Sequence, residues 1–477
     1  MGSWDPARFR AFSFPMRSVR PAVLVLAASL YACPVAGGPS VVETEPVLEA
    51  ATLVRPALLS GPGFSVEPRV EIRGYMARFQ LRTPYGLLRA DSVEMLAERE
   101  AELPALEALE RVTHSEAFLR AAGDRFTATA SSLAQIALHP VETILGIPAG
   151  VARYFEARAR KVGTQAQNLS DRTARRFGVE GDPFPDDDGP MNDPPVAGTD
   201  AATPEKHWYT PIAREATREV KRRVKYGQVK RELAGRLGID PYTSNPLIQE
   251  RLSGLAWVGS GGSFGAGTAL GAVGGLGATV LSTGGRINEV VWQLAPEDLR
   301  ERNRERLEGH CRDTFLIRQF LRRGVFSPTL QTGLADALDV LRPLEGCDAV
   351  LELAMTADTP LEARFLVNAL RLLAAHPDIA AGRLLPVGAG LAYLAPDGAL
   401  LLPLPVDYLS WTDEVRVFLD RPGFRVVDKT VLIGGEASLA ARRGLVERGW
   451  SIRQQAPWPG APPYAPSGEP EAIDLDR

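Results

Sequence analysis

The chain has 477 residues, 45% of them hydrophobic, so it is long enough to bury more than one core, and we expect two or three domains. Its formal net charge of −4 and its pI near 5.9 argue against a nucleic-acid partner. Three cysteines are too few for a disulfide-rich scaffold.

The N-terminal segment, 1–38, has the pattern of an export signal. Arg17 and Arg20 precede the uncharged run 22–32, which is too short to anchor the chain across a bilayer but has the length of a secretory signal. Fifteen residues precede Met16, so Met16 is an alternative start of the protein.

The residues at the end of this signal allow three interpretations of how the chain is processed. Leu30-Tyr31-Ala32-Cys33 resembles the bacterial lipobox, which predicts a lipidated Cys33 and a lipoprotein in the cell envelope, the outer membrane included. Ordinary cleavage near Ala36 or Gly38 would instead release a periplasmic protein. The third alternative is a cytoplasmic protein with a chance apolar run. The pattern favours export over the cytoplasm.

We expect a hairpin-plus-helix domain over 39–177. Residues 39–63 show little pattern and predict a tether, whereas the alternation over 70–81 and the turn at 83–86 predict a β-hairpin or strand pair with one wet face. Asp91 or Ser92 can cap the following helices, and helical patterning continues to about Arg158. Apolar residues there fall near helical spacing: Val93, Leu96, Leu103, Leu106 and Leu109.

An acidic, proline-rich linker is predicted over 178–206. Its Asp186-Asp187-Asp188-Gly189 lacks the alternate-residue ligands and the glutamate at the twelfth position that a calcium loop needs, so we expect no metal.

The segment 207–296 combines a basic helix with a Gly-rich apolar run. The helix, 214–236, holds nine basic and three acidic residues, which favours either contact with anionic lipid headgroups or a solvated face paired with the acidic linker. The turn chemistry of 239–246 leads into another helix. The phrase Gly238 to Trp257, with the Gly-rich run after it, resembles an uncharacterised group of exported Gram-negative bacterial proteins with no known activity, a resemblance that implies export and assigns no catalytic residue.

The run 253–285 carries no charge and holds twelve glycines. Small residues recur at every fourth position, which lets two helices approach closely, either within a membrane, in self-association, or in a tightly packed soluble core. The run also contains Gly261-Gly262-Ser263-Phe264-Gly265, a literal nucleophile elbow, if 255–258 is a strand. Ser263 is therefore the candidate nucleophile of a serine hydrolase, with Asp336, Asp339 or Asp348 and then His376 as partners.

The C-terminal α/β domain is predicted over 297–456, and it begins with a charged helical region, 297–324. His310 beside Cys311 predicts a structural pair and no metal site, because no second pair of ligands accompanies it. In an oxidising compartment Cys311 and Cys347 can pair and close a loop of about 36 residues, worth roughly 3–4 kcal/mol; two free, buried cysteines are the alternative. Apolar spacing over 330–375 predicts helical cores.

Strands follow in this domain. Residues 384–394 and 399–404 flank the turn 395–398, and Thr412 begins a short helix that includes 415–419. Lys429–Ile433 predicts a buried strand, 437–448 a helix and 450–453 another strand. Gly434 and Gly435 turn the chain before that helix and are candidates for binding a small anion. The last residues, 457–477, with six prolines, predict a disordered tail.

The sequence thus predicts an α+β protein, mostly helical, with an N-terminal β-hairpin plus helices, a Gly-rich central segment and a C-terminal α/β unit. We expect an exported envelope protein that binds a partner, itself or a membrane, more readily than an enzyme, and we expect no cofactor. The alternative is a serine hydrolase that uses Ser263.

Overall fold

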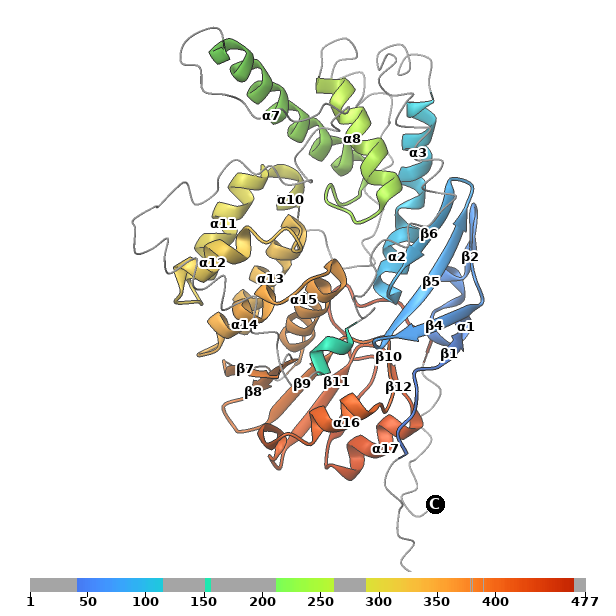
Figure 1. Ribbon diagram of the computed structural model, residues 1–477, viewed down its shortest axis with the longest axis vertical. Coiled ribbons are helices and arrows are strands. Elements are labelled where there is room, and N and C mark those ends of the chain that lie inside the picture. Colours follow the sequence, from blue (N-terminus) through green and yellow to red (C-terminus); the bar gives the residue numbers. More distant parts are fainter. Residues whose placement is uncertain are drawn as a thin grey trace, which may run out of the picture. The chain divides into compact units, whose positions relative to one another are not determined.

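The computed structural model describes four stretches of the chain: 41–114, 151–155, 212–260 and 289–466. Within the last of these, Asp378, Ala380 and Ala389 are not described. All of them belong to one compact unit, Ser40–Ile473. Helices and sheets both contribute to it, so the predicted α+β class is confirmed (Figure 1). The predictions for Cys33, Ser263 and the linker lie outside the described residues.

The N-terminal sheet has six strands in the order β1-β4-β5-β3-β2, with β6 paired to β5. In β4, Val70 and Ile72 are buried while their neighbours are exposed, as expected of a strand with one wet face. The strands are β1 (Val47–Glu49), β2 (Ser60–Gly61), β3 (Phe64–Val66), β4 (Arg69–Arg73), β5 (Met76–Thr83) and β6 (Gly86–Ala90).

Two predictions for this region need correction. The stretch 70–81 contains a turn, because Gly74 and Tyr75 both have positive φ, 56° and 65°, the geometry of a tight hairpin. The predicted tether, 39–63, is wrong, since residues 47–61 form β1, α1 (Ala50–Leu53), a 3₁₀ turn at Pro56–Leu58 and β2. Apolar side chains that are scattered along this segment without a regular spacing, including Leu53 and Leu58, are buried against the sheet.

Two helices follow the sheet and lead to a helical cluster. Ser92 caps α2 (Val93–Ala101) by accepting a hydrogen bond from the amide of Met95, as predicted. Buried apolar side chains of α3 (Leu103–Thr113), α7 (Ile212–Leu237) and α8 (Pro246–Ser260) form one core. The hydrolase alternative requires a strand at 255–258, but these residues continue α8.

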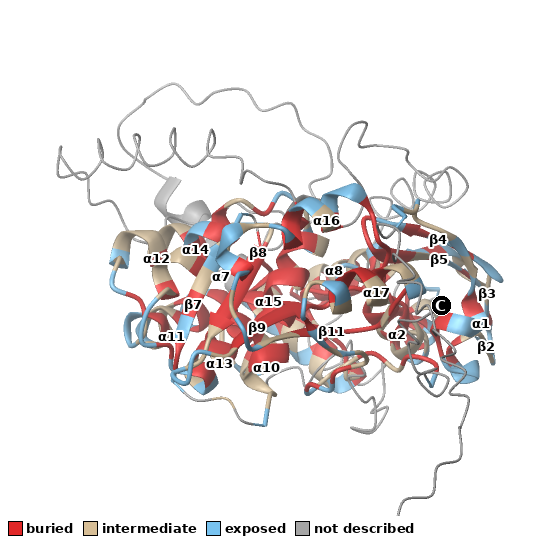
Figure 2. Cartoon of the chain, turned by 90° about the horizontal axis from the view of Figure 1, so that it is seen from below, coloured by how far each residue is buried: buried red, intermediate tan, exposed pale blue. Residues whose placement is uncertain are grey.

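The chain then forms a run of helices that surround the main core. The predicted helical regions 297–324 and 330–375 are confirmed, and Figure 2 shows buried residues concentrated along α15 and the strands beside it. The helices are α10 (Val290–Gln293), α11 (Pro296–Glu308), α12 (Thr314–Leu321), α13 (Pro328–Leu341), α14 (Cys347–Met355) and α15 (Pro360–Ala374).

The C-terminal sheet has the order β13-β11-β9-β8-β7. Antiparallel pairing joins β7, β8 and β9, and parallel pairing joins β9, β11 and β13. Each parallel pair needs a crossover, which α16 (Asp413–Leu419) and then α17 (Leu439–Glu447) supply. Figure 1 shows α15 above this sheet and both crossover helices below it. The strands are β7 (Arg383–Val387), β8 (Gly390–Leu394), β9 (Leu400–Leu404), β11 (Lys429–Ile433) and β13 (Ser451–Arg453).

Most strand and helix predictions for this sheet are confirmed, including the turn 395–398 and the start of a short helix at Thr412, whose side chain caps α16. The stretch 384–394 is two strands, because Gly388 turns the chain with φ of 66°. The predicted tail, 457–477, is wrong for its first ten residues, in which Trp458 and Tyr464 are each only 7% exposed.

Candidate functional site

A buried carboxylate joins three separate parts of the chain. Asp407 precedes the short strand β10 (Tyr408–Leu409) and is 1% exposed. Its Oδ2 accepts hydrogen bonds from the backbone amides of Ala77, in β5, at 2.9 Å and Val93, in α2, at 3.1 Å. Its Oδ1 accepts one from the hydroxyl of Tyr464 at 2.8 Å. The side chain therefore holds the N-terminal sheet, the first helix and the C-terminal segment together.

The protonation of this carboxylate is unusual. Burial raises the pKa of Asp407 to about 7, although the hydrogen bonds from Ala77, Tyr464 and Val93 oppose the shift. An ordinary aspartate would be fully ionised at neutral pH, whereas Asp407 exchanges its proton near pH 7. Burial also raises the pKa of the Tyr464 hydroxyl, so that group stays a hydrogen-bond donor.

A second carboxylate, Glu94, lies in the same buried region. It is 6% exposed, and burial raises its pKa. Its Oε2 accepts a hydrogen bond from Asn368 Nδ2 at 2.7 Å, and its Oε1 lies 3.7 Å from Arg364 Nη1. The same guanidinium is 2.5 Å from Glu98 Oε1. Together these ion pairs join α2 to α15, so the polar cluster bridges the N-terminal and helical parts of the fold.

Both carboxylates border a very small cavity. Its volume is about 10 Å³, and its wall includes Ser92, Trp458 and Tyr464 besides the two acids. That volume is about the space one water molecule needs. The cavity can therefore hold one water molecule but has no room for a substrate. The chemistry that the cluster supports is the gain and loss of a proton within a contact between parts of the fold.

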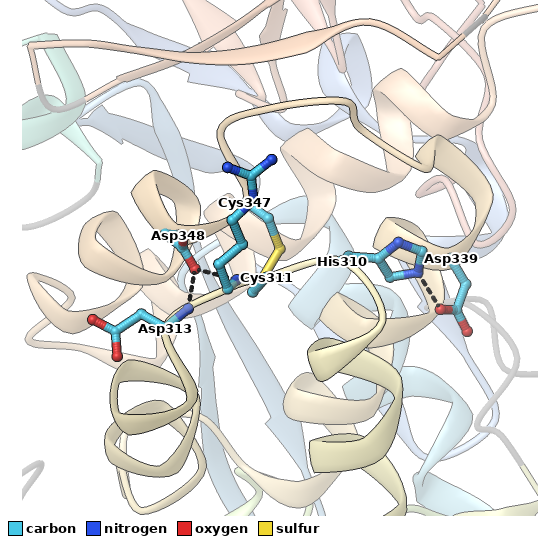
Figure 3. Close-up of a disulfide and its surroundings, with 7 residues drawn as sticks. His310, Cys311, Asp313, Asp339, Cys347 and Asp348 are labelled. Atoms are coloured by element: carbon cyan, nitrogen blue, oxygen red, sulfur yellow. Dashed lines mark hydrogen bonds and ion pairs between the residues drawn. A yellow bond between two sulfur atoms is a disulfide. The ribbon is translucent and has the colours of Figure 1, made fainter.

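The predicted cysteine pair is joined in the structure. Cys311 and Cys347 form a disulfide with their Cα atoms 5.0 Å apart, and each residue is 4% exposed (Figure 3). Asp348 reinforces the link, because its Oδ1 accepts hydrogen bonds from the backbone amides of Arg312 and Asp313 at 3.0 Å each. The bond fastens the loop after α11 to the start of α14, so of the two alternatives for these cysteines, pairing is the one observed.

His310 pairs with a carboxylate. Its Nε2 lies 2.7 Å from Asp339 Oδ1, and Figure 3 shows the imidazole directed to that carboxylate and away from the disulfide. Arg306 Nε contacts the other oxygen of Asp339 at 2.6 Å. Within the described ranges, no three His, Cys, Asp or Glu side chains are arranged to hold a metal ion.

The basic helix is partly turned inward. Lys230 is 5% exposed and donates a hydrogen bond to Gln249 Oε1 at 2.8 Å, and burial lowers its pKa to about 8. Tyr226, Val229 and Leu233 on the same helix are buried in the core with α8. Its second half therefore packs one face against protein, a feature that the even spread of basic residues obscured.

Gly434 and Gly435 do not offer free donors for an anion. The amide of Gly434 donates to the carbonyl of Leu404 at 2.9 Å, and that of Gly435 donates to the carbonyl of Val406 at 2.8 Å. A Cβ on Gly435 would lie 2.0 Å from the carbonyl oxygen of Asp407. The two glycines serve close backbone packing beside Asp407, and the anion-site interpretation loses its basis.

The three aspartates proposed as partners of Ser263 have other contacts among the described residues. The residues that would form the strand before Ser263 are helical, and Asp339 pairs with His310 rather than with His376. Asp336 contacts Arg306, and Asp348 accepts the two backbone amides beside the disulfide. Ser263 itself lies outside the described residues.

Sequence reasoning missed the residues of the buried cluster, above all Asp407, Glu94 and Tyr464. One signal was available for Asp407, since a lone acid directly follows the apolar run Leu400–Val406. Neither Glu94 in a charged helix nor Tyr464 in a proline-rich segment carries a comparable signal.

No helix in the described stretches combines the length and the apolarity that a bilayer crossing demands. No family model matches the sequence, and the searches of curated proteins and of solved structures found no similar chain.

Proposed function

We propose that this is an exported protein of the bacterial cell envelope, lipid-anchored through Cys33 or released into the periplasm, that acts by binding a partner. The observation that carries the proposal is the disulfide between Cys311 and Cys347. Disulfides persist in exported proteins and are rare in the reducing cytoplasm. The disulfide therefore supports the same compartment as the signal pattern of 1–38.

The proposal includes the domain organisation that the sequence predicts. An N-terminal hairpin-plus-helix portion, a Gly-rich central segment and a C-terminal α/β portion would present a basic helix and the run 253–285 to a membrane or to a second copy. Nine basic residues over 214–236 support attraction to anionic headgroups, although Lys230 is turned inward.

Cell fractionation tests the proposal. Cells expressing the tagged full chain are labelled with palmitate, with Cys33→Ala as the matched variant. A lipoprotein predicts label and membrane residence that the variant loses. Unlabelled protein in the periplasm would indicate ordinary cleavage, and unlabelled protein that stays in the membrane fraction in both chains would favour the run 253–285. Protein in the cytoplasm in both cases would refute export.

A further inference from the structure

A groove of about 570 Å³ lies outside the buried cluster, between α13, α15 and the segment 457–459. That volume falls in the range typical of small-molecule sites. Its walls are largely apolar and include Ala337, Val340, Ala374 and Trp458. Val340 is 59% exposed and leaves apolar surface open at the groove. The groove is thus accessible and suited to a hydrocarbon body.

Arg371 supplies the positive charge of this groove. Among the described residues its guanidinium has one hydrogen bond, from Nη1 to Asn368 Oδ1 at 3.3 Å. A guanidinium carries five N–H donors, so the described part of the chain leaves most of them without an acceptor. Burial lowers the pKa of Arg371, and the neighbouring carboxylates, Glu94 first, offset this shift only in part. An anion bound in the groove would accept hydrogen bonds from these N–H donors and would stabilise the charge of the guanidinium.

Gly333 makes room for this side chain. A Cβ at residue 333 would lie 2.6 Å from Nη2 of Arg371, so the guanidinium lies against the backbone of α13 and would have to shift if residue 333 carried a side chain. The acid of the groove, Asp336, is already compensated, because Arg306 Nη1 contacts its Oδ1 at 2.5 Å. Arg371 is therefore the group that can receive a ligand's charge.

We propose that this groove binds a small apolar carboxylic acid, with the carboxylate on Arg371 and the hydrocarbon body between Val340, Ala374 and Trp458. One planar guanidinium matches one carboxylate, which it can bind through two parallel N–H donors. The apolar walls favour a ligand whose remainder is hydrocarbon. This site is independent of where the protein resides in the cell.

The test uses the full chain and displacement of the neutral fluorescent probe N-phenylnaphthylamine. Decanoate and n-decanol are the competitors, since they share a hydrocarbon tail and differ in charge. Decanoate should displace the probe at a concentration about tenfold or more below that of decanol, as a charge-assisted contact implies. Arg371→Gln should remove this advantage and leave decanol unchanged, whereas Arg312→Gln, at an exposed position, should behave as the wild type.

A second variant guards against an indirect effect of Arg371 on folding. Val340→Glu adds a negative charge at an exposed position of the groove and should weaken decanoate binding about tenfold or more without altering the unfolding curve. Equal displacement by decanoate and decanol in the wild type would overturn the proposal. So would decanoate binding that survives both Arg371→Gln and Val340→Glu, or a failure of the probe to bind at all.

Discussion

Among single residues, Asp407 is the side chain that links the N-terminal sheet, α2 and the C-terminal segment. It accepts three hydrogen bonds from β5, α2 and the C-terminal segment, and Gly435 packs against its carbonyl. A buried carboxylate with three donors is well satisfied when charged, yet burial still raises its pKa to about 7. The effect of desolvation on the pKa therefore outweighs that of the hydrogen bonds, and the contribution of Asp407 to the stability of the fold depends on pH.

The sign of this dependence follows from the direction of the shift. Asp407 holds its proton up to about pH 7 when folded but loses it near its ordinary pKa of 3.8 when unfolded. The folded state therefore binds more protons between these values, and its stability falls as the pH rises through that window. We expect this group to contribute a decline of roughly 2–4 kcal/mol in the free energy of unfolding from pH 4 to pH 7.

Asp407→Asn is the matched variant, because an amide can accept the two backbone hydrogen bonds and donate to Tyr464. Denaturant unfolding across this pH range should show a flatter profile for the variant. Some slope should remain, since burial raises the pKa of Asp240 to about 6 and acts in the same direction. Identical profiles for the wild type and the variant would show that Asp407 titrates normally.

At the scale of elements, the segment 457–466 behaves as part of the core. Trp458 belongs to the main core, Tyr464 packs in the N-terminal core, and Val54 forms a β-bridge with Tyr464. The amide of Ala465 donates to the carbonyl of Leu53 at 2.9 Å. The segment thus ties the beginning of the described chain to its end.

Substitutions in this segment should be costly. Trp458→Ala should lower the free energy of unfolding by about 3–5 kcal/mol, because it removes a buried aromatic ring. Tyr464→Phe should cost about 1–2 kcal/mol, the effect of losing the hydrogen bond to Asp407. Glu447→Ala, at an exposed position on α17, serves as the control and should stay within about 0.5 kcal/mol. A wild-type unfolding midpoint for Trp458→Ala would contradict the packing described for the segment.

Local signals account for what the sequence predicted well. Ser92 and Thr412 cap helices as their positions indicated, and the turn 395–398 closes a hairpin. Long-range pairing accounts for what it missed. The segment around Tyr464 is proline-rich and reads as a tail, and its partners at Val54 and Asp407 become visible only when the fold brings them together. The strand that the hydrolase alternative required at 255–258 is part of a helix, and a short apolar run alone does not distinguish a strand from a buried helix.

At the scale of the whole molecule, the proposed export explains how the cysteines are used. The disulfide closes a loop with a sequence separation of 36 residues and lies within the main core. Such a loop contributes roughly 3–4 kcal/mol by restricting the unfolded chain, and an oxidising compartment would maintain it. The redox state of Cys311 and Cys347 in the cell therefore reports on the compartment.

Thiol trapping in growing cells tests this claim most directly. Cells expressing the Cys33→Ala chain, which retains only Cys311 and Cys347, are quenched in acid, and the denatured protein is treated with a heavy maleimide before and after reduction. We expect no gel shift before reduction and two added maleimides after it, whereas the same chain without residues 2–38 should take up two maleimides without reduction. Full uptake without reduction by both chains would contradict export.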